Sequence, residues 1–110
     1  MEKKRVGRLG EELAAALLEE RGYRIVMRNF SCKFGEVDII ARKGGLIAFV
    51  EVKTRLSEDY GRGRESVTAA KRQRIRWCAE YYLSHTRWVY DTVDFQVIEI
   101  SAQQLKGLEF

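Results

Sequence analysis

The sequence has no proline, one histidine (His85) and two isolated cysteines, Cys32 and Cys78, with no CxxC pair. These shortages argue against a zinc finger, a Cys/His protease and a Ser-His-Asp triad. The sparse cysteine usage indicates a reducing cytoplasm. No apolar run is long enough to span a bilayer, and the basic N-terminus lacks the apolar stretch of a signal peptide. We therefore expect a cytoplasmic protein with no membrane partner.

The chain also lacks repeats, low-complexity segments and linkers, so its 110 residues are expected to form one domain. Its core is predicted over about 6–100, followed by a tail over 101–110 without a strong pattern. Hydrophobic residues make up 45% and charged residues 33%, which is typical of a globular protein. The formal net charge of +4 is compatible with a polyanionic partner but does not require one.

The distribution of the basic residues is more informative than the net charge. Seven of them cluster just after the centre of the chain: Arg55, Arg62, Arg64, Lys71, Arg72, Arg74 and Arg76. A surface that contacts nucleic acid is one interpretation. The other is a solvated helix face.

Hydrophobic periodicity predicts an αβββαβ order. The expected elements are a helix over about 6–21, a strand over 23–29, a hairpin over 35–55, a helix from a cap at Ser66 or Thr68 to about 84, and a strand over about 93–100. Short links make the first three strands an antiparallel meander. The second helix is long enough for a right-handed crossover, which makes the last strand parallel to the third. The fold class is thus α/β, with a mixed central sheet flanked by helices.

The central hairpin contains the functional signal of the sequence. A two-residue turn at Gly44-Gly45 places Asp38 opposite Glu51 and Glu36 opposite Lys53. Because side chains alternate along a strand, all four are expected on one face. That face is predicted to carry Ile40 and Phe49 as well, and the other face Val37, Ile39, Ala48, Val50 and Val52. Two opposed carboxylates repel each other unless something positive lies between them.

Asp38 and Glu51, with a backbone carbonyl and waters, suit a hard cation such as Mg²⁺. Such a metal activates a water and offsets charge on a phosphoryl oxygen. The ammonium of Lys53 is placed to hold the attacking water or the phosphate, and Glu36 either orients Lys53 or forms a cross-strand ion pair with it. The set favours a metal-dependent phosphodiesterase over surface decoration.

Each helix offers one charged residue on a face otherwise made of small or apolar residues. Glu11 shares its direction with Ala14 and Leu18, whereas Glu12 points to a charged side. Glu11 is therefore either a site residue or a carboxylate that favours the helix N-terminus. Gly10, beside it, is interpreted as permitting a close approach of another backbone.

On the second helix, Lys71 aligns with the apolar stripe of Ile75, Cys78 and Tyr82, and Gln73 lies on a more polar side. Lys71 is thus expected to point toward the sheet near the hairpin. The alternative is snorkelling, in which the stem covers apolar surface and the ammonium stays in water.

These residues resemble a known family. Asp38, a hairpin and Glu51-Val52-Lys53 resemble the D…(E/D)xK signature of the PD-(D/E)XK nuclease superfamily, and the fuller pattern is similar to the YraN-like family of bacterial proteins. The further matching pieces are Gly10-Glu11, Gly22-Tyr23, Arg28-Asn29, Gly35-Glu36-Val37-Asp38-Ile39-Ile40, Phe49-Val50, Thr54-Arg55, Tyr60-Gly61, Ser66-Val67 and Lys71. Val37 stands where the superfamily name has proline.

The resemblance extends to archaeal Holliday-junction resolvases and implies a restriction-endonuclease-like αβββαβ core. It implies Asp38 and Glu51 as metal ligands, Glu11 as a third metal-site residue and Lys53 as the catalytic lysine, with Glu36 in support. The implied phosphate contacts are Arg55, Lys71, Arg72 and Arg74. The implied cofactor is Mg²⁺ or Mn²⁺, and the implied substrate is DNA, including branched or recombination intermediates.

Two alternatives to an endonuclease stay open at this point. One is a nucleic-acid-binding module that keeps the fold and the basic surface without turnover, and the other is a plain interaction domain. A junction resolvase also needs two active sites and hence a homodimer, for which the aromatic residues Trp77, Tyr81 and Trp88 are interface candidates.

Overall fold

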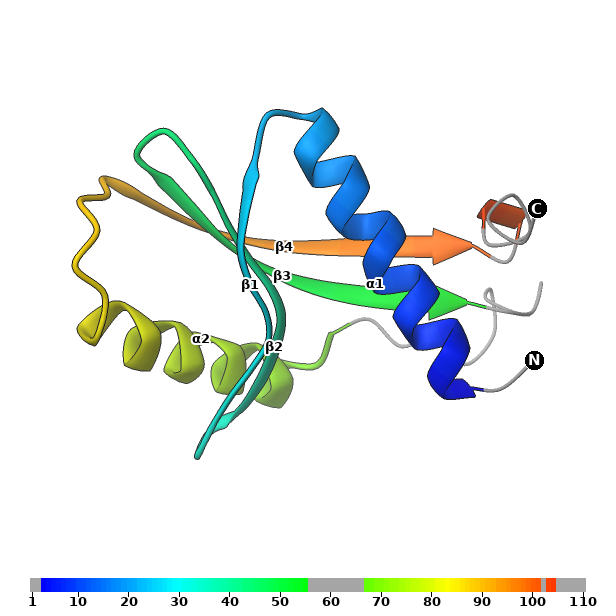
Figure 1. Ribbon diagram of the computed structural model, residues 1–110. Helices are drawn as coiled ribbons and strands as arrows, with labels where there is room; N and C mark the ends of the chain where they lie inside the picture. The colour runs from blue at the N-terminus through cyan, green and yellow to red at the C-terminus, as the bar shows by residue number, and fades with distance from the viewer. Residues whose placement is uncertain (1–2, 56–66, 102, 105–110) are drawn as a thin grey trace.

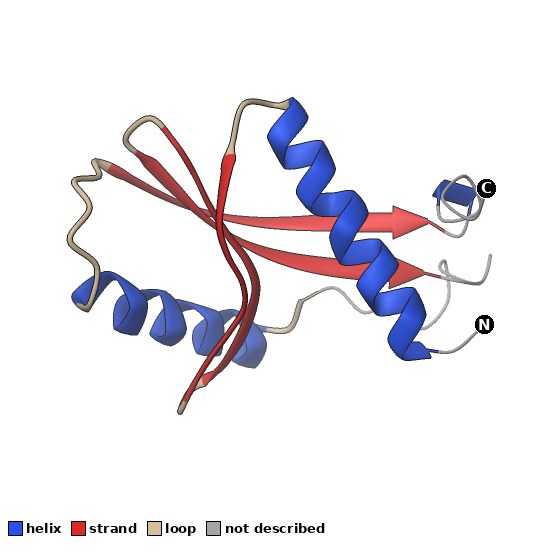
Figure 2. Cartoon of the chain, in the orientation of Figure 1, coloured by secondary structure: helices blue, strands red, loops and turns tan. Residues whose placement is uncertain are grey.

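The computed structural model describes residues 3–55, 67–101 and 103–104. Its elements are α1 (Lys3–Glu20), β1 (Arg24–Cys32), β2 (Gly35–Lys43), β3 (Leu46–Arg55), α2 (Ala69–Ser84) and β4 (Thr92–Ser101), as Figures 1 and 2 show. The strands form one sheet in the order β1-β2-β3-β4. β1, β2 and β3 are antiparallel neighbours, and β4 runs parallel to β3. The predicted fold class, element order and parallel last pair are confirmed.

The element ends differ from prediction mainly at β1. This strand runs to Cys32, where a strand ending at Asn29 was predicted, because β1 continues to pair with β2 as far as Cys32 opposite Gly35. The second helix has Thr68 as its N-cap, whose side chain accepts a hydrogen bond from the Lys71 backbone N–H. Residues 56–66, which include the predicted polar link over 56–64 and Arg62 and Arg64 of the basic cluster, and most of the predicted tail lie outside the described residues.

The first helix ends at a glycine, as predicted. Gly22 has a φ of 94°, which L side chains rarely adopt. Its N–H donates to the Glu19 carbonyl, and the Tyr23 N–H donates to the Leu18 carbonyl. These two bonds form a Schellman cap, which turns the chain back toward the sheet and into β1.

Helices cover the sheet on both faces, and α1 crosses the strands in front of β3 and β4 in Figure 1. On the α1 face, Ala14, Ala15 and Leu18 pack against Ile39, Ala41, Ala48 and Val50. On the α2 face, Cys78 and Ala79 pack against Val37, Ile40, Ile47 and Phe49. The hairpin strands are therefore buried on both sides, which explains why their sequences are nearly continuously apolar.

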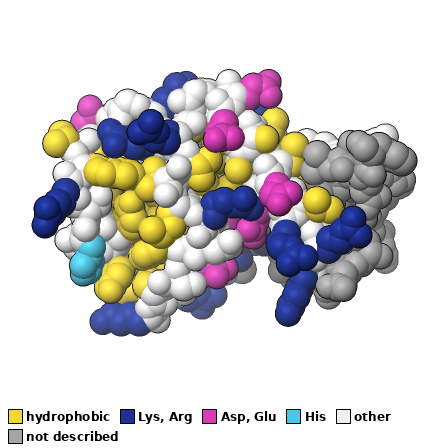
Figure 3. Space-filling model, viewed as in Figure 1, with side chains coloured by type: hydrophobic (Ala, Val, Ile, Leu, Met, Phe, Trp, Pro, Cys, Tyr) yellow, Lys and Arg dark blue, Asp and Glu magenta, His cyan; other side chains and the backbone are white. Residues whose placement is uncertain are grey.

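The second helix leaves the outer strand β4 partly uncovered. Val93, Phe95 and Val97 alternate along β4 and are 36%, 43% and 55% exposed. The side chains between them belong to the α1 side, where Ile98 packs against the buried core. Figure 3 views the other side of this part of the sheet, where α1 lies in front, and shows hydrophobic side chains gathered on the half away from the chain termini. Acidic and basic side chains lie between them and the grey residues.

The predicted register of the hairpin holds only near its turn. Residues 39–43 of β2 pair with residues 46–50 of β3 in the expected register. Beyond this point the two strands separate, so the prediction of two further cross-strand pairs, Asp38–Glu51 and Glu36–Lys53, is wrong. In Figure 1 the outer part of the β1–β2 pair turns away from β3 and β4.

The separation has a side-chain cause. Asp38 Oδ2 accepts a hydrogen bond of 2.8 Å from the Val52 backbone N–H, so a carboxylate replaces a backbone partner of β3. The alternation of β2 also breaks here, because Val37 packs on the α2 face together with Ile40 and not, as predicted, with Ile39. Asn29, which faces this point from β1, has a φ of 56°, a conformation that asparagine tolerates better than most residues.

Among the described residues, no helix is long and apolar enough to cross a membrane.

The approach of α1 to β3 depends on Gly10. A Cβ at Gly10 would collide with the Thr54 hydroxyl, whereas a Cβ at Gly7, one turn earlier, would meet nothing within 4 Å. We expect Gly10→Ala to lower the free energy of unfolding by about 1–3 kcal/mol through overpacking. The control Gly7→Ala should raise it by up to about 1 kcal/mol, because alanine is the better helix former. Urea denaturation measures both; equal effects at the two positions would contradict this account of the contact.

Candidate active site

Asp38 lies at the point where β2 leaves β3. Its carboxyl group is largely removed from water, and this desolvation raises the pKa of Asp38 to about 7. The hydrogen bond from the Val52 N–H acts in the opposite direction, and the negative charges of Glu51, Glu11 and Glu36 raise the pKa further. In the part of the chain that the structure describes, no positive charge compensates the ionised form of Asp38.

Glu51 is the buried carboxylate of the site. It is 8% exposed, and its Oε2 lies 2.5 Å from the Lys71 ammonium. β3 carries Glu51 on the face that α2 covers, and the first turn of α2 brings Lys71 over it. The prediction that Lys71 points toward the sheet is confirmed. Among the described residues, Glu51 thus has a cationic partner and Asp38 has none within ion-pair distance.

Glu11 reaches the site from α1. Its Oε1 lies 3.9 Å from Arg28 Nη2 on β1, and the polar side chain of Asn29 favours the ionised form of the same carboxylate, which lowers its pKa. Burial raises the pKa of Glu11, the two β1 residues oppose this, and the charges of Glu36 and Glu51 add to the increase. The bend at Asn29 therefore brings a polar side chain to Glu11.

Glu36 is the most exposed carboxylate of this group. Its Oε2 accepts a hydrogen bond of 3.2 Å from the Ser31 hydroxyl on the paired strand β1. The predicted role of orienting Lys53 from the opposite strand has no structural basis, because β2 pairs only with β1 at this position. Glu36 instead adds negative charge beside Asp38.

A pocket of about 180 Å³ joins these groups, and its lining consists of Gly35, Glu36, Asp38, Glu51, Lys71, Arg74 and Ile75. Carboxylate oxygens are the ligands that Mg²⁺ and Mn²⁺ prefer. Asp38 and Glu51 fit such an ion, because a divalent charge would offset the burial and the repulsion between carboxylates that together raise the Asp38 pKa. Among the described residues no three acidic, histidine or cysteine side chains are close enough to form a complete ligand set. Glu11 thus lies near Asp38 and Glu51 but does not form a three-ligand set with them.

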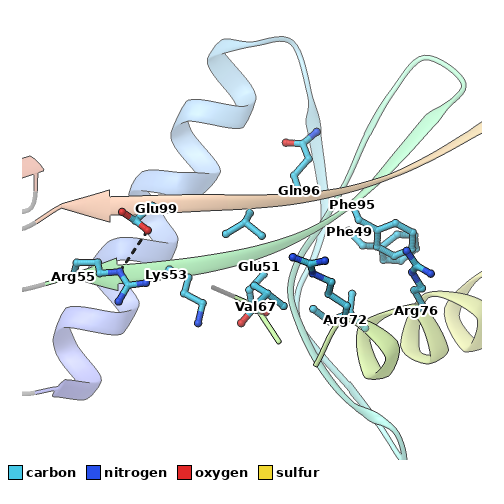
Figure 4. A pocket seen from close by; sticks show the side chains of 12 residues that line it. Phe49, Glu51, Lys53, Arg55, Val67, Arg72, Arg76, Phe95, Gln96 and Glu99 are labelled. Carbon is cyan, nitrogen blue, oxygen red and sulfur yellow. Dashed lines mark hydrogen bonds and ion pairs between the residues drawn. The ribbon is translucent and has the colours of Figure 1, made fainter. Parts of the chain in front are cut away.

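Lys53 lies on the other side of Glu51, in a larger groove of about 350 Å³ between β3, β4 and α2. Figure 4 shows Lys53 and Arg72 projecting into the space between β3 and α2. Glu51 and Ile75 line both the groove and the carboxylate pocket. The predicted catalytic lysine and the predicted metal ligands are therefore on adjoining surfaces that Glu51 connects.

The predicted phosphate contacts divide between these two surfaces. Arg74 lines the carboxylate pocket and Arg72 lines the groove. Arg55 also lines the groove, but its Nε lies 3.4 Å from Glu99 Oε2 on β4, an ion pair visible in Figure 4. Gln73 is exposed on α2, in agreement with the predicted polar side.

Comparison with known proteins places this chain in a family. Residues 10–100 match the model of the Uncharacterised protein family UPF0102. This chain belongs to that family. A UPF0102 protein of Clostridium perfringens (strain SM101 / Type A) is 48% identical over 99 residues, which cover 89% of this chain and 80% of the relative. A UPF0102 protein of Syntrophus aciditrophicus (strain SB) is 47% identical over 97 residues, which cover 88% and 76%.

A third relative, from Moorella thermoacetica, is 44% identical over 100 residues, which cover 91% of this chain and 83% of the relative. The expected membership of the YraN-like family is confirmed, since UPF0102 is that family. The matched span includes Glu11, Asp38, Glu51, Lys53 and Lys71.

The sequence interpretation missed the groove of this UPF0102 chain. Phe95 was expected in a strand, but nothing identified it as an exposed ring beside Arg76. The sequence did contain a signal for this groove. It was the row of alternating apolar residues on β4, combined with a second helix too short to cover four strands. The contacts of Arg28 and Asn29 with Glu11 were also missed, because they depend on the bend in β1.

The raised Asp38 pKa predicts a pH dependence of stability. Between about pH 4 and pH 7 the folded state keeps the Asp38 proton that the unfolded state releases, so this residue destabilises the fold progressively as pH rises through that window. In EDTA, Asp38→Asn should therefore gain stability relative to the wild type between pH 5 and pH 8. Urea denaturation at both pH values measures the gain. The exposed-site control Glu80→Gln should show none, and a gain for Asp38→Asn that is already complete at pH 5 would contradict the assignment.

Proposed function

We propose that this UPF0102 protein is a Mg²⁺- or Mn²⁺-dependent endonuclease of the PD-(D/E)XK type that hydrolyses DNA phosphodiester bonds in the cytoplasm. The observation that carries the proposal is the pocket in which Asp38 and Glu51 meet Lys71 beside the Lys53 side of β3. The D…ExK spacing and the αβββαβ topology support the same reaction class. The resemblance to junction resolvases suggests branched or recombination intermediates as substrates.

Asp38 and Glu51 would hold the cation in this proposal, with Glu11 acting from α1. A bound divalent cation lowers the pKa of a coordinated water and offsets charge on the phosphoryl oxygens. Lys53 is the residue that would hold the water or a non-bridging oxygen of the scissile phosphate. Lys71 supplies the counter-charge of Glu51 in the absence of substrate, because its ammonium contacts that carboxylate directly.

The surrounding basic residues suit a polyanionic substrate. Arg72, Arg74 and Arg76 are exposed along one helix, and each borders the pocket or the groove. DNA approaching this face would meet cations before it met the buried carboxylates, which reduces the repulsion between phosphate and carboxylate. Junction cleavage would additionally need two such sites and hence a homodimer.

One observation favours a second function, a DNA-binding module without turnover. The Lys71 ammonium already occupies Glu51, and the described residues contain no complete set of three metal ligands. A protein that never recruits a cation would keep the fold, the basic surface and this ion pair. Cleavage assays separate the two functions.

We expect the purified protein to cut DNA four-way junctions, duplexes or single strands with Mg²⁺ or Mn²⁺ and not with EDTA. Asp38→Asn and Lys53→Ala should each lower the rate by about 100-fold or more, because each removes a group that stabilises developing charge. Binding measured by electrophoretic mobility shift in EDTA should persist in both variants. Binding without cleavage under every metal condition would favour the inactive module, and the absence of salt-sensitive binding would exclude both functions.

The two adjacent glutamates of α1 provide a matched pair. Glu11→Gln should lower the cleavage rate and raise the Mn²⁺ concentration needed for half-maximal activity, since Glu11 adds negative charge near Asp38. Glu12→Gln should leave both unchanged, because Glu12 is exposed on the opposite side. If the two variants had equal cleavage rates and equal Mn²⁺ requirements, Glu11 would not belong to the proposed site. Isothermal titration with Mn²⁺ provides a readout independent of activity.

A further inference from the structure

The groove beside the carboxylate pocket has a floor of aromatic and aliphatic side chains. Phe49, Ile75, Phe95 and Val97 contribute its apolar surface, and its volume of about 350 Å³ is within the range of small-ligand sites. Phe49 is fully buried, whereas Phe95 is 43% exposed. The two rings are 5.8 Å apart with an interplanar angle of 27°, so Phe49 supports Phe95 from below.

The rim of this groove is basic. Lys53, Arg72 and Arg76 border it, and among the described residues none of the three has a carboxylate within ion-pair distance. The two acidic residues of the lining, Glu51 and Glu99, are paired with Lys71 and Arg55. The surface therefore combines an exposed aromatic ring with uncompensated positive charge.

We propose that this groove binds an unpaired nucleotide of the DNA substrate, with its base stacked on Phe95 and its phosphate held by Lys53 and Arg72. The inference rests on the proposed function and adds to it the class of substrate: DNA with single-stranded nucleotides next to the cleaved bond. Aromatic rings and arginine planes that hold single-stranded bases are a general solution, because every base has a stacking face.

Arg76 is placed to stack on the second face of the base, opposite Phe95. Its guanidinium lies over the Phe95 ring, 6.0 Å from the centroid, and the side chain is exposed on α2. A base stacked between the guanidinium and the ring requires the exposed Arg76 side chain to move outward. Figure 4 shows Arg76 beside the two phenylalanine rings and Arg72 one turn nearer to Glu51.

The position of the groove agrees with a nucleotide adjacent to the reacting phosphate. Glu51 lines both the groove and the carboxylate pocket, and Lys53 follows it on the same face of β3. A strand that follows β3 from Lys53 past Glu51 would bring a base to Phe49 and Phe95.

A second copy of this chain is a less suitable occupant. A two-fold interface places each patch against itself. The rim residues Lys53, Arg72 and Arg76 of one copy would then lie near the same residues of the other, and juxtaposed like charges oppose association. A nucleotide instead supplies an aromatic plane for Phe95 and a negative charge for the rim.

The test compares two fluorescein-labelled strands of equal length and charge, about 16 nucleotides each: oligothymidylate and an abasic oligomer. Fluorescence anisotropy in EDTA gives the affinity of each without turnover. The wild type should prefer oligothymidylate by about 5- to 100-fold, in keeping with the stacking of one base. Phe95→Ala should abolish the preference, and Phe95→Tyr should keep it. The control Trp77→Ala should also keep it, because Trp77 has the same exposed fraction, 43%, but lies against Phe34 outside the groove.

Arg72→Gln separates charge from stacking, because Arg72 borders the groove and is assigned to the phosphate and not to the base. It should weaken binding to both strands and lower the slope of log affinity against log salt by about one. A wild type without preference for oligothymidylate, or a folded Phe95→Ala that keeps the preference, overturns the inference. So does a Phe95→Ala that converts a dimer into a monomer in sedimentation while the preference remains. If the wild type prefers oligothymidylate but never cuts DNA, the proposed nuclease function is wrong and the nucleotide-binding groove still stands. If it cuts DNA without the preference, the groove inference is wrong and the nuclease function still stands.

Discussion

The hydrogen bond from the Val52 N–H to Asp38 Oδ2 determines the geometry of the whole site. It replaces a backbone contact of the sheet, so β2 leaves β3 and opens the pocket between them. The same bond orients the Asp38 carboxyl group and opposes in part the burial that raises its pKa. A regular hairpin would have continued the ladder through Asp38 and left no space between the strands. The pocket thus exists because one side chain competes successfully with the backbone.

Small residues on α1 provide the second constraint. Gly10, Ala14 and Ala15 let the helix lie close to the sheet, and Gly10 does so against Thr54, one residue beyond Lys53. This approach brings Glu11 within the electrostatic range of Asp38 and Glu51. A bulkier helix face would hold Glu11 farther away and weaken its influence on their charge. Packing on one face of the sheet therefore contributes to the chemistry on the other.

The sequence was sufficient for the fold because its periodicities were clear: helical spacing in α1, two apolar runs around Gly44-Gly45, and a helix long enough to cross over to a parallel β4. It also placed Asp38, Glu51 and Lys71 in one region. It failed where a side chain overrides the pattern. The break in alternation at Asp38 moves Val37 to the other face and separates Glu36 from Lys53, and no period-2 rule anticipates this. The exposed ring of Phe95 depends on which strands α2 leaves uncovered, which is a tertiary property.

Charge compensation connects the two surfaces that meet at Glu51. In the carboxylate pocket, the charges of Glu51, Glu11 and Glu36 add to the burial that raises the pKa of Asp38, and the Lys71 ammonium is already engaged by Glu51. The groove has the opposite imbalance, with Lys53, Arg72 and Arg76 on its rim. A cation on one side and an anion on the other would each be stabilised by the protein, and each would reduce the field that opposes the other's binding. Binding of the two should therefore be mutually reinforcing, as expected for a site whose metal and phosphodiester substrate act together.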